Sequence, residues 1–395
     1  MSDEPSTDTG RFETVDWEAF DPEETAVGLP RWLPATAALI AVAFAYDYLS
    51  ADGFPVTITG LDWLLIAGLF VLGSLVILPI SQSPGQVRRY WEQFRQDRLA
   101  VACLLYLTLF FLVGLFGPLH YNDPLLHVVY SSQPPVWGSV DTIYVIQCYG
   151  PVVDGMCQGT WEFPLGTTAI AGKDALTLLV IGTRTSLSVV LGATAIVVPT
   201  GVTVGVVAEE FGGRVEAVLM ALAEQLQSFP AVLIYLLLFF WIVEGRLLLL
   251  IVALGLVGWG GLAQLVRNEI RVLRHEQYVE AAELGGVGSG RLLGRHLLPN
   301  VAPSVLTNVT LQVPLFLLIE VTISFIEISV VGSSVTMGDP TNFSWGRQSY
   351  NALYSVEGPA VWWLVGAPIL LVFLTVFAFN VVGDALVDAL EPRAD

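Results

Sequence analysis

The sequence contains eight apolar runs, each long enough to cross a hydrocarbon core about 30 Å thick, which takes roughly 20 residues. Of all residues, 54% are hydrophobic and only 13% are charged, whereas a soluble globular chain carries about 25% charged residues. This pattern predicts an all-α polytopic membrane protein and all but excludes a soluble enzyme. The runs lie near residues 33–50, 62–80, 99–117, 186–208, 217–243, 247–266, 304–328 and 361–383.

The fifth run is the least regular. Its first half contains Glu224, Gln225 and Gln227, and only 229–243 is cleanly apolar. Pro230 lacks a backbone N–H and cannot continue the hydrogen-bond ladder of a helix. We therefore expect a kink at this proline.

The positions of the arginines predict the orientation of the chain, because short cytoplasmic loops are enriched in Lys and Arg. Two arginine-rich segments stand out, and an even number of spans connects them, so both are expected on the cytoplasmic side. The same count predicts that both termini are cytoplasmic and that 118–185 and 329–360 face outward. The arginines are Arg88, Arg89, Arg95 and Arg98 before the third run, and Arg267, Arg271, Arg274, Arg291 and Arg295 after the sixth.

The chain is strongly acidic, with 17 Lys and Arg against 36 Asp and Glu and a net charge of −19. Nine of these acids lie in residues 1–30, which we interpret as a disordered cytoplasmic tail. The only lysine is Lys173. Such a composition is similar to that of proteins from salt-loving organisms such as haloarchaea, and it argues against nucleic acid as a partner, since phosphate binding requires a basic face.

The outward segment 118–185 contains Cys148 and Cys157. Disulfides persist on the oxidising side of a membrane, so these two residues are either bonded or two free thiols in a loop. Inside the spans, Glu224 and Glu320 are expensive to bury. They are candidates for lining a translocation pathway, and the alternative is a structural hydrogen bond or a paired charge.

The segment 278–300, YVEAAELGGVGSGRLLGRHLLPN, is polar and glycine-rich between the sixth and seventh spans. Glu280, Ala281 and Ala282 favour a helix, which the glycines that follow should end. The run 291–298 is amphipathic and leads into the seventh span at Pro299. This indicates a helical lever joined to a membrane helix, and the alternative is an ordinary inner loop whose arginines only set the topology.

This segment resembles the signature E-A-A-x3-G-x9-I-x-L-P of ABC importer permeases. In that family it forms the coupling helix that docks into a cleft on the ATPase subunit. The resemblance implies ATPase-coupling roles for the matching positions, with His296 standing where the family has Ile. The matching residues are Glu280, Ala281, Ala282, Gly286, Leu298 and Pro299.

Further motifs are similar to the second, C-type permease of dipeptide, oligopeptide and nickel importers. The family's outer motif H-P-L-G-T-D-x-x-G-R-D is matched in part between Phe163 and Asp174. Phe163, Thr168 and Lys173 stand where the family has His, Asp and Arg, and there is one extra residue before Gly172. The family's G-x-R-x-S-L is matched by residues 182–187. The resemblance implies a type I core of six spans in 88–395, preceded by two extra transmembrane helices in 31–87. Within this core we expect the outward loop at 118–185 and the cytoplasmic coupling segment at 267–303.

The same resemblance implies partners at the plasma membrane: a second permease, two ATP-binding subunits and an extracellular solute-binding protein. It implies a peptide or nickel as the transported solute. The sequence has no G-x-x-x-x-G-K-[ST] phosphate loop, no C-x-x-C and no H-x3-H pair. We therefore expect a non-catalytic subunit without metal or cofactor, whose partners hydrolyse ATP. The alternative is a secondary transporter in which Glu224 and Glu320 carry protons.

Overall fold

The computed structural model describes residues 32–50, 59–82, 84–121, 128–169, 172–239, 246–331, 343–355 and 358–390. This part of the chain is mostly helical. The helices are α1 (Trp32–Leu49), α2 (Gly60–Gln82), α3 (Pro84–Phe94), α4 (Arg98–His120), α5 (Ala175–Phe211), α6 (Gly213–Ser228), α7 (Ala231–Phe239), α8 (Arg246–Arg274), α9 (Gln277–Leu284), α10 (Ser289–Leu292), α11 (Leu298–Val331), α12 (Trp345–Leu353) and α13 (Trp362–Leu390).

The helical, membrane-spanning fold is confirmed. Six helices are long and apolar enough to cross a membrane, namely α2, α4, α5, α8, α11 and α13. The fifth predicted run is a broken pair, α6 and α7, bent by 73° at Phe229 and Pro230. The first run forms α1, whose apolar part, Leu33–Leu49, is shorter than the six full spans.

Three helices extend beyond the spans predicted for them, namely α5, α8 and α11. α5 begins at Ala175, about three helical turns before the end of the outward segment predicted at 118–185. The Thr, Gly and Arg residues at 182–185 lowered the hydrophobicity of the first turns of α5, so the sequence did not indicate that the helix begins there. The helix starts at Ala175 because the Asp174 side chain caps it by accepting the backbone N–H of Thr177. Likewise α8 extends to Arg274 and α11 begins at Leu298, so only 275–297 of the predicted 267–303 lies between them.

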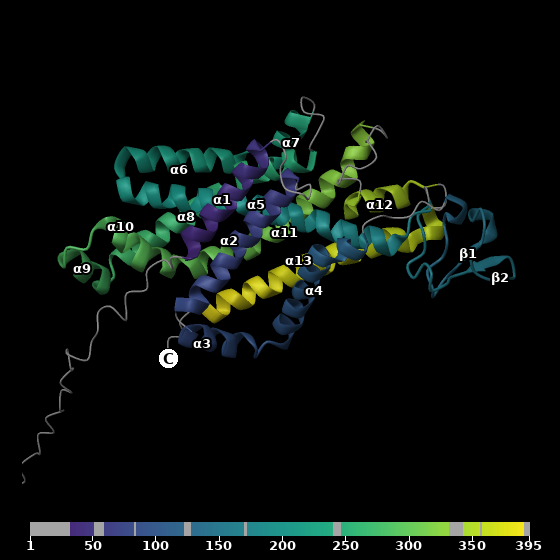
Figure 1. The fold of residues 1–395 in the computed structure, drawn as a ribbon, viewed down its shortest axis with the longest axis horizontal. Coiled ribbons are helices and arrows are strands. Elements are labelled where there is room, and N and C mark those ends of the chain that lie inside the picture. Colours follow the sequence, from purple (N-terminus) through teal and green to yellow (C-terminus); the bar gives the residue numbers. More distant parts are fainter. Residues whose placement is uncertain are drawn as a thin grey trace, which may run out of the picture.

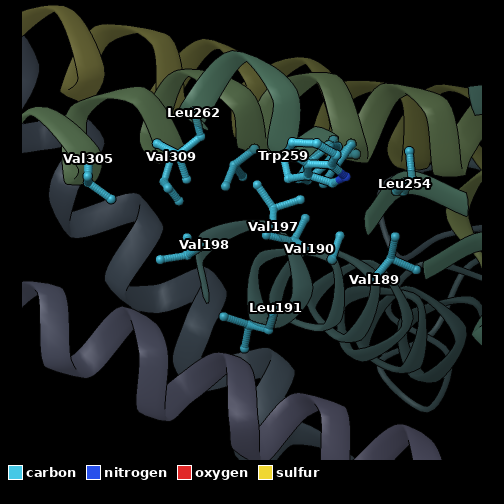
Figure 2. Close-up of a cluster of buried hydrophobic side chains, with 14 of the residues drawn as sticks. Val189, Val190, Leu191, Val197, Val198, Leu254, Trp259, Leu262, Val305 and Val309 are labelled. Carbon is cyan, nitrogen blue, oxygen red and sulfur yellow. The ribbon is translucent and has the colours of Figure 1, made fainter. Parts of the chain in front are cut away.

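The centre of the bundle is the packing of α5 against α8. Val190 and Val197 of α5 lie on the side of Trp259 of α8, and Val305 and Val309 of α11 lie in the same cluster near Leu262 (Figure 2). A glycine allows this close approach, since a Cβ on Gly205 would lie 2.7 Å from the carbonyl oxygen of Ala263. Small residues at helix contacts are typical of membrane bundles, where van der Waals packing drives association.

The helix α2 packs directly on this centre. A Cβ on Gly68 would overlap the backbone carbonyl of Leu191 in α5. Near the start of α2, Asp62 forms an ion pair with Arg184 of α5 at 3.0 Å. The second of the two extra helices is therefore part of the core in this structure.

The outward segment folds into a small lobe, a feature that the all-α prediction missed. Its three-stranded antiparallel sheet has the order β1-β3-β2, and a disulfide joins Cys148 to Cys157 of β3. The buried Gln133 ties two loops of the lobe together, since its amide donates to Gln147 O and accepts from Tyr149 N. The strands are β1 (Ser139–Asp141), β2 (Val152–Val153) and β3 (Met156–Gln158).

The bundle is elongated, with α9 and α10 at one end and the β lobe at the other (Figure 1). α13 runs from the lobe end back toward α3, which it contacts. The two arginine-rich segments, at the start of α4 and around α9, thus lie toward the same end. The β lobe and the helices α9 and α10 therefore lie at opposite ends of the bundle.

A methyl group on α2 tests whether this helix is integral to the core. We expect Gly68→Ala to destabilise the protein by about 1–3 kcal/mol, because the new Cβ forces α2 away from α5. Gly73→Ala on the same helix is the matched control, since nothing lies within 4 Å of its Cβ position. Thermal unfolding in detergent measures both variants, and equal melting temperatures would contradict the packing described.

Candidate coupling segment and buried polar cluster

The segment between α8 and α11 forms two short helices joined by a glycine turn. α9 ends at Leu284, and Gly286 follows with φ of +81°, in the left-handed region that favours glycine. α10, a π-helical turn at Leu293–Leu297 and α11 then follow one another without a break. The helix, turn and amphipathic continuation predicted from 278–300 are therefore present.

One side of this segment is anchored and its tip is exposed. Val279 of α9 and Leu297 at the end of the π-helical turn are fully buried. Leu284, by contrast, is 91% exposed, the highest value for a large hydrophobic side chain in the described part of the chain. The tip of α9 therefore presents an apolar side chain beside the glycine turn.

Three arginines near the end of α8 form ion pairs with neighbouring helices. Arg267 and Arg271 both contact Glu216 of α6, with Arg271 Nη2 at 2.6 Å from its carboxylate. Arg271 also pairs with Glu209 of α5 at 2.9 Å, and Arg274 pairs with Glu210. The Glu216 carboxylate pairs with two arginines and so joins α6 to α8. The carboxylates of Glu209 and Glu210 join α5 to the same end of α8.

A carboxylate lies fully buried between three helices toward the outer end of the bundle. Glu320 of α11 has no exposed surface, and three serine hydroxyls donate to it. Ser186 of α5 donates at 2.9 Å, Ser324 of α11 at 3.2 Å and Ser344 at 2.5 Å. Because Ser344 is the N-cap of α12, this polar cluster fixes α5, α11 and α12 to one another.

The G-x-R-x-S-L motif of α5 supplies a contact to a different helix at nearly every position. Gly182 leaves room for Trp345 of α12, Arg184 pairs with α2, and Ser186 bonds Glu320. Leu187 is fully buried against Gly114 of α4. The motif therefore sets the positions of four neighbouring helices.

Comparisons with known proteins match these features. The model of the family described as "Binding-protein-dependent transport system inner membrane component" matches residues 201–395. The model "N-terminal TM domain of oligopeptide transport permease C" matches residues 85–135. The dipeptide transport system permease protein DppC of Bacillus subtilis is 30% identical over 305 residues, 77% of this chain and 84% of the relative.

The chain belongs to this permease family. The oligopeptide transport system permease protein OppC of Escherichia coli K12 is 31% identical over 310 residues, 78% of this chain and 92% of the relative. OppC of Bacillus subtilis is 28% identical over 303 residues. This permease is thus a multi-pass inner-membrane component of an ABC importer, non-catalytic itself, and family membership favours this over the secondary transporter.

The structure places the predicted coupling residues in one stretch of the permease. Glu280, Ala281 and Ala282 lie in α9, and Ala281 is exposed. Leu298 and Pro299 form the first turn of α11, and Gly286 lies in the turn between α9 and α10. Their role in ATPase coupling stays a prediction.

The two predicted pathway carboxylates of the permease lie in different surroundings. Glu224 is exposed on α6, whereas Glu320 is enclosed by serines. The structure does not bring them together, and Glu320 in this conformation corresponds to the structural alternative. Ser344, which lies 24 residues beyond Glu320, had no sequence signal beyond its polar type.

The buried cluster predicts a stability effect. Ser186→Ala removes a hydroxyl donor to a buried carboxylate, and we expect a loss of about 1–3 kcal/mol. Ser228→Ala is the matched control, because Ser228 is exposed and its hydroxyl bonds only a carbonyl of its own helix, that of Glu224. Thermal unfolding of the purified permease measures both, and a Ser186 variant as stable as the control would show that the cluster does not hold the helices.

Proposed function

We propose that this permease forms half of the translocation pathway of a peptide importer. Its complex would contain a second permease, two ATP-binding subunits and an extracellular solute-binding protein. The relatives reported above are named for dipeptide and oligopeptide transport, which favours a peptide over nickel as the solute. In this complex the chain catalyses no reaction. It converts movement of the ATPases into opening of the pathway alternately to the two sides of the membrane.

The observation that carries the coupling role is the exposed apolar tip of α9. Leu284 is 91% exposed beside the left-handed Gly286. Burying one leucine side chain in a partner's cleft contributes about 1.5–3 kcal/mol. The small residues of the turn, including Gly288 and Gly290, have open space around their Cβ positions and let a second protein approach the backbone.

Continuity of the helical segments then supports transmission of force. α10 and the π-helical turn pass directly into α11, so displacement of the tip moves the inner end of α11. α11 carries Glu320 in its outer half, about 33 Å from its first residue, where the serine cluster joins it to α5 and α12. A push at the inner end thus reaches helices at the outer end.

The proposed orientation places α9 and α10 in the cytoplasm and the disulfide-bonded lobe outside. Both termini would then be cytoplasmic. We also propose the division predicted from the sequence, with a tail at 1–30, the two extra helices at 31–87 and the permease core at 88–395. The tail lies outside the described residues.

Substitution at the tip tests the coupling role. Leu284→Asp places a charge where the ATPase would bury an apolar side chain, and we expect peptide uptake and copurification of the ATPase to fall at least about tenfold. Gly286→Asp should act in the same direction, because it puts a charged side chain at a left-handed position in the same turn.

Gly288→Ala is the matched control, since it adds one methyl group to the same turn in open space and at a φ of −66°. It should leave uptake unchanged. The folding of all three permeases is followed by thermal unfolding without the ATPase, which should show no large loss for Leu284→Asp. Full uptake and normal ATPase binding by the Leu284 variant would refute the coupling role.

A further inference from the structure

A polar groove lies between α8 and α11 near the end that carries the coupling segment. It is shallow and open to the surface, with a volume of about 480 Å³. Four of its seven lining residues are polar. Its lining residues are Gly261, Gln264, Leu265, Asn268, Glu269, Val272 and Asn308.

The groove is closed toward the outer side. One turn further out, Gln312 of α11 donates to the carbonyl oxygen of Gly258 in α8 at 2.8 Å. A Cβ on Gly258 would lie 3.1 Å from Phe316, so the two helices touch there.

The polar groups of the groove are free to bind a ligand. Within the described residues, the side-chain amides of Gln264 and Asn308 have no hydrogen-bond partner. The Asn268 amide oxygen accepts from Arg267 Nη1 at 3.0 Å, which leaves its NH₂ group as a donor. Gln264 and Asn308 are half-buried, and unpaired polar groups in a membrane span are expensive and mark a water-filled cavity or a contact.

The charge of the groove is negative. Glu269 lies on the same helix as Arg267, Arg271 and Arg274, but these three pair with carboxylates of α5 and α6. Across the part of the chain that the structure describes, no ion pair involves Glu269. Its carboxylate is therefore left to attract a cation at the groove.

We propose that this α8–α11 groove binds the peptide at the cytoplasmic end of the pathway. Glu269 contacts the terminal ammonium group of the peptide. The side-chain amides of Gln264, Asn268 and Asn308 bind its backbone. A peptide offers the complementary groups, because its amide carbonyls and N–H groups match side-chain amides and its free amino terminus matches a carboxylate. This inference rests on the proposed function and assigns it contact residues.

Transport by the complete complex tests the assignment. The permease is reconstituted with its partner subunits in proteoliposomes, and initial uptake of alanyl-alanine and trialanine is measured together with ATP hydrolysis. Glu269→Gln should lower uptake about fivefold while the complex stays assembled and ATP hydrolysis continues. Glu162→Gln, an exposed carboxylate of the outer lobe, is the control and should leave uptake unchanged.

A second measurement does not depend on uptake. Val272→Cys places a thiol at the groove, and Val215→Cys places one on exposed α6 at the same end. In the described chain the native Cys103 is buried and the other two cysteines are bonded, so a polar maleimide labels the new thiol selectively. Trialanine at millimolar concentration should slow labelling at position 272 and leave that at 215 unchanged.

The outcomes separate this inference from the function on which it rests. If the wild-type complex imports neither peptide, the proposed function fails and the inference falls with it. If the wild type imports peptide but Glu269→Gln imports it equally and trialanine protects neither thiol, only the inference is overturned. Loss of the second permease from the Glu269→Gln complex would also overturn it, because the groove would then be a subunit contact.

Discussion

A carboxylate without exposed surface inside a membrane bundle is the constraint on which the half of this permease near the β lobe depends. Glu320 cannot be left without donors, because a desolvated polar group costs several kcal/mol. Serines from three segments meet this requirement, and they bring α5, α11 and the start of α12 to one point. Trp345 packs beside it, fully buried, and donates to the Leu179 carbonyl oxygen of α5. The polar cluster thus specifies how the outer helices fit together.

The inner half is held by a different kind of interaction. There the arginines of α8 pair with carboxylates of α5 and α6, at an end where water and counterions can screen them. Between the two polar regions the contact of α5 with α8 relies on glycine and close apolar packing (Figure 2). α11 spans the whole distance and carries the coupling segment at one end and Glu320 at the other. α11 therefore connects residues 275–297 at one end of the bundle with the Glu320 cluster near the other.

The sequence alone predicted the parts governed by local rules. Apolar length located the spans, and Pro230 located the break between α6 and α7, since both signals act within one helix. The glycine turn at Gly286 was likewise predictable from the sequence, because glycine readily adopts the left-handed backbone conformation. The resemblance carried by residues 280–299 identified the family correctly.

What the sequence could not supply is long-range pairing. Arg184 and Asp62 are separated by 122 residues, and Ser186 and Glu320 by 134, so no local pattern joins them. The arginines near the end of α8 indicated topology only, although in the structure they also bind α5 and α6. The small β lobe was missed because its strands have only two or three residues.

The central claim is that the tip of α9 is the contact through which ATPase movement enters the membrane. Cross-linking from Leu284→Cys in the assembled, transporting complex tests it most directly, with a short thiol-to-amine reagent and mass spectrometry of the products. The account predicts that position 284 cross-links to an ATP-binding subunit, and that a thiol at position 161 of the β lobe, where Trp161 is 80% exposed, does not. A complex that imports peptide while position 284 cross-links to no ATP-binding subunit would contradict it.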